Sequence, residues 1–250
     1  MGPIKQDYSV FDKLNLERKP VGVKFLPSRP EGIDRIKNKL ALCEMFLAAQ
    51  ESAPFYVQKE DFLCVEPLLL GMEDPEPVLV SGFAGGSAGL FKEPRANRKV
   101  YQYVPKMLKG SVKCVAFAAV DRLTFDPDVV IITANVTQAR SILRAEGYTS
   151  GESWSSQGTP VMACSWMYIY PVVTGKINYT VTGLSLGMQA LNVPLPEGLF
   201  IISIPWNLLP TVMTNLEDPN LYRSWKTSGR DEHFKRFEVR LTNLRELMKS

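Results

Sequence analysis

The chain has 250 residues, of which 45% are hydrophobic and 22% are charged, with a formal net charge of +3. These values exclude wholesale disorder, since such a chain carries enough apolar surface for one large domain or two small ones. The charge is too small and the basic residues too dispersed to indicate a nucleic-acid-binding surface, so we expect no nucleic-acid partner.

The beginning of the chain has no apolar run of the kind that a signal peptide needs. The longest strongly apolar segments, near 112–120 and 199–205, are too short to cross a bilayer. We therefore expect a cytoplasmic protein without a membrane partner. In that compartment, cysteines are expected as thiols or metal ligands rather than disulfides. There are four of them: Cys43, Cys64, Cys114 and Cys164.

Near the start, "KPVGVKFLP" at 19–27 predicts a strand, because its apolar residues alternate and a proline stands near either end. Residues 32–52 have apolar side chains at roughly helical spacing, which predicts an amphipathic helix with Cys43 on or near its buried face. The next segment, 54–64, is expected to be extended or a loop. Residues 65–77 predict a short apolar turn or helix that prolines end.

A glycine-rich stretch, "SGFAGGSAG" at 81–89, follows a predicted strand at 77–80. Glycines let backbone amides approach an anion, and Lys92 and Arg95 stand just downstream. The stretch nevertheless lacks the Gly-Lys-Ser/Thr ending of a P-loop, and its spacing does not fit the dinucleotide fingerprint. We prefer a flexible turn or a close-packed strand end, and a helix is predicted after it, at 94–108.

Two apolar segments, "VKCVAFAAV" at 112–120 and "DVVIIT" at 128–133, predict buried strands. A helix predicted over 135–148 and closed by Gly147 follows at once. This order favours an α/β fold with a mixed sheet flanked by helices. The polar segment 147–160 is either the main interior loop of one domain over residues 1–250, which we prefer, or a division between two α/β halves.

The remainder predicts strands at 161–175, 177–183 and 199–205, a helix at 206–216 interrupted by proline, and a C-terminal amphipathic helix at 231–250. The apolar seam of this last helix is expected to pack on the protein's own core. The alternative is a homo-oligomer in which the helix pairs subunits.

Histidine is nearly absent, since His233 is the only one. A Ser-His-Asp or Cys-His catalytic pair would have to use it, and a histidine-rich zinc or iron site cannot be built within one chain. We interpret His233 as an exposed residue of the C-terminal helix. Hydrolase functions are therefore disfavoured.

The cysteines show neither a C-x-x-C motif nor ferredoxin-type spacing, so the sequence supports no zinc ribbon and no thioredoxin-type dithiol. Cysteines that are distant along the chain can still converge in space. From the residues alone, two interpretations stay open, four inert buried thiols or ligands contributed by different loops.

Four motifs stand in order over most of residues 18–190: "RKPVGVKFLP", "LCEMFLAAQESAPFYVQKEDFLCVEPLLLGM", "FDPDVVIITANVTQARSIL" and "CSWMYIYPVVTGKINYTVTGLSLGM". In this order they resemble the DUF169 family, prokaryotic proteins of unassigned function. The family typically shows a cysteine entering a helix, a Glu-Asp pair shortly before a second cysteine, and a third cysteine ahead of a Pro…Thr-Gly segment. The resemblance thus implies a role for Cys43, Cys64 and Cys164 and leaves out Cys114, which stands inside a predicted strand.

Our leading hypothesis is a soft-metal cofactor, preferably a [4Fe–4S] cluster, bound by Cys43, Cys64 and Cys164, because thiolates suit iron–sulfur centres. Many relatives have a further cysteine after the Thr-Gly segment, and this chain has none there. The fourth ligand position would then be open or filled by a non-cysteine group. The nearest carboxylates are Glu44, Glu60, Asp61 and Glu66. A redox or cluster-exchange partner would follow from such a cofactor.

A second hypothesis is a non-metal module that binds a nucleotide, another small molecule or a tetrapyrrole. Its cleft would lie between residues 81–89 and one aromatic face formed by Trp166, Tyr168 and Tyr170 of a strand. A third hypothesis is a subunit that docks through its C-terminal helix. Whether the protein is an enzyme stays open at this stage.

Overall fold

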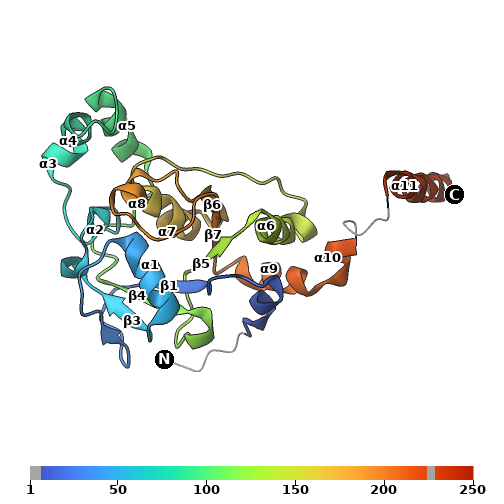
Figure 1. Ribbon diagram of the computed structural model, residues 1–250, viewed down its shortest axis with the longest axis horizontal. Coiled ribbons are helices and arrows are strands. Elements are labelled where there is room, and N and C mark those ends of the chain that lie inside the picture. The colour runs from blue at the N-terminus through green and yellow to red at the C-terminus, as the bar shows by residue number, and fades with distance from the viewer. Residues whose placement is uncertain (1–6, 224–228, 250) are drawn as a thin grey trace.

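Figure 1 shows the computed structural model of the chain, in which residues 7–223 and 229–249 are described. A seven-stranded mixed sheet forms its centre, in the order β2-β3-β4-β1-β5-β7-β6. Helices pack on both faces of the sheet, which confirms the predicted α/β class. The strands are β1 (Val21–Leu26), β2 (Asp34–Arg35), β3 (Phe55–Val57), β4 (Cys114–Ala119), β5 (Val129–Ala134), β6 (Asn178–Val181) and β7 (Phe200–Pro205).

The helices vary from single turns to the 18 residues of α11. No helix in the described part of the chain is long and apolar enough to span a membrane. The α-helices are α1 (Leu42–Glu51), α2 (Glu66–Leu69), α3 (Pro77–Val80), α4 (Phe83–Ser87), α5 (Pro94–Tyr103), α6 (Val136–Ser150), α7 (Ala163–Thr174), α8 (Leu186–Ala190), α9 (Leu209–Glu217), α10 (Pro219–Arg223) and α11 (Arg230–Leu247). The 3-10 turns are η1 (Ser9–Leu14), η2 (Lys59–Asp61) and η3 (Val120–Arg122).

The central strands divide the core into two layers. Both β4 and β5 are buried along their whole length, as their continuous apolar runs predict. Because side chains alternate along a strand, Val129 and Ile131 of β5 pack with α1 and α7, whereas Val130 and Ile132 pack with α6 and α9. The first of these layers carries the candidate functional site.

Strands from before and after the segment 147–160 belong to the same sheet. β5 pairs antiparallel with β7 along its whole length, from Val129↔Pro205 to Ala134↔Phe200. The helix before the segment is longer than predicted, since α6 runs through Gly147 and ends at Ser150, with Gly151 as its C-cap. Gly151 has φ +71°, the left-handed conformation that favours glycine after a helix. The interior loop therefore begins later than the sequence suggested.

The helix predicted over 32–52 forms only in its second half, as α1. Residues 34–35 form β2 instead, which pairs in parallel with β3 through Asp34↔Phe55 and Arg35↔Tyr56. The helix begins where Glu44 Oε2 accepts the backbone N–H of Ala41 at 2.7 Å. Cys43 lies in the first turn and is buried, as predicted.

The strand and loop predicted over 77–89 are wrong, because this segment forms the short helices α3 and α4. Gly82 has φ +88°, and a Cβ there would stand 2.2 Å from the carbonyl oxygen of Pro94. A Cβ on Gly85 would stand 2.1 Å from Nδ2 of Asn97. The glycines thus allow α4 to pack closely on α5. These glycines are required for helix packing, which argues against a phosphate-binding loop.

The strand predicted over 161–175 is also wrong, because the segment forms α7. Its aromatic and β-branched residues have high strand propensity, but tertiary packing overrides such preferences. The rings of Trp166 and Tyr170 are 5.7 Å apart, as residues one helical turn apart are expected to be. Tyr168 does not share that contact, so the aromatic face predicted for a strand does not form. The strands predicted at 177–183 and 199–205 are confirmed as β6 and β7, and Pro210 begins α9 rather than interrupting it.

The predicted C-terminal helix forms as α11, but it does not pack on the protein's own core. Phe237 and Leu244 are 53% and 54% exposed, and Met248 is 88% exposed. Figure 1 shows α11 standing away from the sheet and the other helices. Docking on the core is therefore wrong, and pairing of subunits stays a prediction. The side chain of His233 lies outside the described residues, as does the interpretation made for it.

Removing residues 229–250 is expected to leave the midpoint of thermal unfolding within about 2 °C of the full chain, because α11 contributes little buried surface. Circular dichroism on both chains measures this. A chain ended at residue 208 is the matched control, since it also loses the buried Val212 and Leu216 of α9 and should unfold at a lower temperature. A large drop on removing α11 alone would contradict the prediction, and light scattering on the same chains shows whether α11 pairs subunits.

Candidate functional site

Two neighbouring chain segments bring Cys43 and Cys64 together. The backbone N–H of Leu40 donates to the carbonyl oxygen of Asp61 at 2.9 Å, and that of Leu63 donates back to Leu40 at 3.0 Å. At the first residue of α1, the N–H of Leu42 donates to Sγ of Cys64 at 3.4 Å. The pairing therefore places the Cys64 sulfur at the N-terminus of α1, next to the residue that carries the first thiol.

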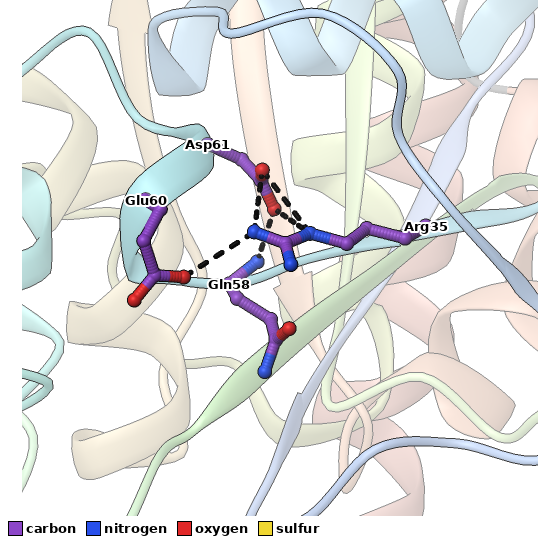
Figure 2. A network of polar contacts seen from close by, with 4 residues as sticks. All are labelled: Arg35, Gln58, Glu60 and Asp61. Carbon is purple, nitrogen blue, oxygen red and sulfur yellow. Dashed lines mark hydrogen bonds and ion pairs between the residues drawn. The ribbon is translucent and has the colours of Figure 1, made fainter.

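An ion pair between Arg35 and Asp61 also holds these two segments together (Figure 2). Arg35 Nε and Nη2 each donate to a carboxylate oxygen of Asp61 at 2.9 Å. Asp61 also accepts the N–H of Gln58 at 2.7 Å, and Glu60 lies 3.3 Å from Nη2 of Arg35. Such a two-point contact sets orientation as well as distance. Glu60 and Asp61, two of the predicted fourth-ligand candidates, therefore engage Arg35.

The third thiol comes from α7. Cys164 lies in the first turn of that helix, and its thiol shares a hydrogen bond with the thiol of Cys43. One turn later, the hydroxyl of Tyr168 donates to the carbonyl oxygen of Leu42 at 3.3 Å. The first turns of α1 and α7 thus meet at the two thiols. The structure brings together the three cysteines that the family resemblance implied.

A buried carboxyl completes the group. Glu66 is the first residue of α2, is 6% exposed, and shares a hydrogen bond with the Cys64 thiol. Of the four candidate carboxylates, Glu66 is the one in hydrogen-bond contact with a site thiol. Glu44 instead holds the N-terminus of α1 through Ala41. The sequence offered no signal for choosing among the four.

Burial and mutual contact shift the titration of the whole group. Burial raises the pKa of Glu66, and burial together with Glu66 raises the pKa of Cys64. The hydrogen bond to Cys43, and then burial, raises the pKa of Cys164 well above its ordinary value. The same bond lowers the pKa of Cys43, because the Cys164 thiol stabilises its charged form. Cys43 is therefore the first of the three thiols to ionise.

Tyr168 is the residue of this site that the sequence did not identify. Burial raises the pKa of its hydroxyl well above the ordinary value, and the charges of the nearby thiols and of Glu66 raise this pKa further, that of Cys164 the most. The hydroxyl is therefore protonated at neutral pH and donates a hydrogen bond to the carbonyl oxygen of Leu42. Its expected role, a member of an aromatic binding face, is replaced by a contact with the thiol group.

A small apolar cavity of about 30 Å³ adjoins Cys43 and Cys164. Its other walls include the thioether side chains of Met167 and Met188. Within residues 7–223 and 229–249, no group of three or more His, Cys, Asp or Glu side chains is arranged to hold a metal ion. In this structure, the Cys164 thiol donates a hydrogen bond to the Cys43 sulfur.

Cys114 lies on the opposite face of the sheet. It begins β4 and is fully buried, and the alternation of side chains places it with Ala116 and Ala118, which pack against Phe125. Val115 and Phe117 of the same strand point to the layer of the other three cysteines. Burial raises the pKa of Cys114. The strand therefore separates it from the candidate site.

The cleft expected between residues 81–89 and the aromatic residues does not form, because neither side has the predicted structure. The glycine-rich segment is helical and packs on α5. Trp166 is enclosed, since its Nε1–H donates to Thr159 Oγ1 at 2.9 Å and its ring lies 6.2 Å from that of Tyr103. These contacts leave the nucleotide and tetrapyrrole hypotheses without the geometry on which they rested.

A mixed α/β sheet with a buried group of three thiols and one carboxyl is thus the kind of protein that the fold and site define. Residues 11–215 match the model of the DUF169 family, described as uncharacterised ArCR, so the chain belongs to that family. No curated protein and no solved structure matches the chain.

Replacing Glu66 by Gln is expected to remove a pH dependence of stability from the metal-free protein. The pKa of Glu66 in the folded state lies above its ordinary 4.5, so the folded protein holds this proton more tightly than the unfolded chain does. Stability is then full below the ordinary pKa and is lost as the pH rises toward the folded-state pKa, by at most about 1.4 kcal/mol per pH unit.

Urea unfolding at a series of pH values from about 4.5 to 7 measures this slope. We expect it in the parent protein and a smaller slope in the Glu66→Gln variant. Glu60→Gln is the matched control, because that carboxyl is 66% exposed and contacts Arg35 instead of a thiol. An equal slope in the parent and in Glu66→Gln would show that Glu66 does not hold its proton on folding.

Proposed function

We propose that the protein binds a cofactor through Cys43, Cys64 and Cys164, and that this cofactor is a [4Fe–4S] cluster. The observation that carries the proposal is the convergence of three thiols and a buried carboxyl from three separate chain segments. Titratable groups with strongly perturbed pKa values cluster at functional sites, which makes this group a candidate for one. Burying Glu66 costs stability, which a purely structural role does not explain.

The charge balance of the group supports a bound cation. The strongest influences on the pKa of Cys164 are the Cys43 thiol, burial and Glu66, and burial is the strongest influence on that of Glu66, so none of these supplies positive charge. The same holds for Cys43 and Cys64. Thiolates in such surroundings need positive charge from another source, and a metal centre supplies it.

The donor set fits iron–sulfur chemistry. Thiolates are the usual ligands of iron–sulfur clusters, and the near absence of histidine disfavours metals that prefer imidazole. Cys43 and Cys164 also lie in the first turns of α1 and α7, where the helix dipoles favour thiolates. When bound, a cluster of this kind supplies one-electron transfer and, with three thiolate ligands, an iron open to a further ligand.

The chain's own residues have distinct roles around that centre. Cys43, Cys64 and Cys164 would hold it, and Glu66 is the candidate for the fourth ligand or for a proton carrier beside it. The N–H of Leu42, which already donates to Cys64, would stabilise the charge on that sulfur. Tyr168 keeps a proton next to the thiols. A cytoplasmic protein with a redox or cluster-exchange partner is the setting we propose for this chemistry.

A second candidate function, thiol–disulfide exchange, is favoured by the hydrogen bond between the Cys43 and Cys164 thiols. The lowered pKa of Cys43 makes it the attacking thiolate. It would attack a sulfur of a small disulfide and release one thiolate. The Cys164 thiol would then lose its proton and attack the Cys43 sulfur, which releases the second thiolate and leaves a Cys43–Cys164 disulfide.

Anaerobic purification followed by iron and sulfide analysis tests the first candidate. About four iron and four sulfide per chain are expected, with broad visible absorption rather than a sharp Soret band. Each of Cys43→Ser, Cys64→Ser and Cys164→Ser is expected to lose the cluster. Cys114→Ser is the matched control and should keep it, because Cys114 lies across the sheet.

Glu66→Gln separates the two roles of the carboxyl. If Glu66 is a ligand, the variant keeps its iron but changes the electron paramagnetic resonance spectrum of the reduced cluster. Iron-free parent protein with an unchanged circular dichroism spectrum would rule the cluster out. Retention of a full cluster by Cys164→Ser would rule out the ligand set.

2-Hydroxyethyl disulfide, a small uncharged disulfide, applied to the metal-free protein tests the second candidate. Peptide mapping is expected to find a disulfide that joins Cys43 to Cys164, because these two thiols are already in contact. Cys114→Ser should form the same disulfide, whereas Cys43→Ser should not. A mixed disulfide that persists on Cys43 in the parent chain would argue against exchange between the pair.

A further inference from the structure

The apolar cavity beside Cys43 and Cys164 adjoins a wider cleft. The cleft has a volume of about 470 Å³ and lies between the loop 156–160 and the edge strand β6. Four residues line both spaces, so the cleft and the cavity share a wall. They are Ala163, Thr180, Val181 and Ser185. A path from the surface to Cys43 and Cys164 would therefore pass through the cleft, the shared wall and the cavity.

The two parts of this path differ in width. The outer cleft has a size typical of small-molecule sites, whereas the inner cavity of about 30 Å³ holds only one or two water-sized groups. Ala163 begins α7 and immediately precedes Cys164, which places the narrow end at the first turn of that helix. A ligand with a slim end would reach the thiols, and a bulky one would stop in the cleft.

The residues that line the cavity and the cleft favour an uncharged ligand. Among the described residues, no Asp, Glu, Lys, Arg or His lines either space. The inner cavity is lined almost wholly by apolar atoms and sulfur, with Phe46, Ile131 and Ile201 among its walls. An ion entering such surroundings would lose its hydration without gaining a partner. An uncharged molecule avoids that cost.

The outer cleft offers neutral hydrogen-bonding groups. The side chains of Gln157 and Thr180 make no hydrogen bond to other described residues of the chain, although Gln157 is anchored through its backbone N–H and carbonyl to Asn178. Amide and hydroxyl groups both donate and accept, which suits a neutral polar ligand.

We infer that this path is the entrance to the thiol site and that its ligand is a small uncharged molecule with a neutral polar end and a slim end that reaches Cys43. The inference rests on the proposed function, since it names the ligand class of the same site. It adds a recognition cleft formed by the loop 156–160 and β6, which belong to neither of the segments that carry Cys43 and Cys64.

Alkylation of the reduced, metal-free protein tests the inference with two probes of similar size. Iodoacetamide is neutral and iodoacetate is anionic, and both replace the thiol proton of cysteine by an alkyl group with loss of iodide and a proton. Mass spectrometry of peptides gives the rate at Cys43 for each reagent, and free glutathione gives the reference ratio. We expect the ratio of neutral to anionic rates at Cys43 to exceed the reference at least about tenfold.

Two substitutions at the shared wall test the route. Ala163→Leu and Thr180→Leu are each expected to slow iodoacetamide at Cys43 about fivefold or more, because added bulk narrows the passage. Val173→Leu, on an exposed site near the other end of α7, is the matched control and should leave the rate unchanged. Circular dichroism measures whether each variant is folded. If one wall variant does not fold, the other still tests the route.

A neutral-to-anionic ratio equal to that of glutathione would overturn the ligand class. Unchanged rates in both folded wall variants would overturn the route. Because the experiment uses metal-free protein, its result does not depend on iron content. Absence of a cluster in the iron analysis would thus refute the proposed cofactor, while the selective alkylation would still support the entrance.

Discussion

The candidate site depends on the short parallel pairing of Leu40 with the segment 61–63. Two backbone hydrogen bonds and the ion pair between Arg35 and Asp61 hold these segments together. Each segment delivers one cysteine within three residues, and the N–H of Leu42 then bonds to Cys64. Without this pairing, α1 would have no fixed relation to the Cys64 loop. The rigid sheet behind it makes the arrangement specific, because β3 pairs with both β2 and β4.

The electrostatics of the site are costly for a protein that uses it only as packing. A buried carboxyl and three thiols share one region, and burial raises the pKa of two of the thiols as well as that of Glu66. Replacing them by apolar side chains would remove that cost. Their presence is explained if they bind something that the apolar alternatives could not, and both a metal centre and a disulfide substrate meet that condition. The lowered pKa of Cys43 serves either chemistry, since a thiolate is both ligand and nucleophile.

Sequence patterns predicted the sheet better than the helices around the site. The strands β1, β4, β5 and β7 could be predicted from alternating or continuous apolar runs, because burial of one or both faces of a strand produces such patterns. α7 did not, since an enclosed helix rich in Trp, Tyr, Ile and Val shows no polar face that would reveal its period. The helix predicted over residues 33–41 did not form for the opposite reason. Helical spacing was present there, but Asp34 and Arg35 pair with β3 instead. Only the family resemblance predicted which cysteines form the site. The choice of Glu66 among the four candidate carboxylates required the structure.

The misassigned helix α7 is also what joins the separate parts of the site. Its first turn carries Cys164 and, through Ala163, forms the wall between the cleft and the cavity. Tyr168 ties the same helix to α1, and Met162 before it has φ +57°, an uncommon conformation for a residue with a side chain. Such backbone strain persists where surrounding contacts enforce it. In a strand, positions 164 and 168 would stand roughly 13 Å apart along the chain axis, whereas in the helix they stand roughly 6 Å apart and both reach α1. The helical state of this segment is therefore a condition for the thiol site itself.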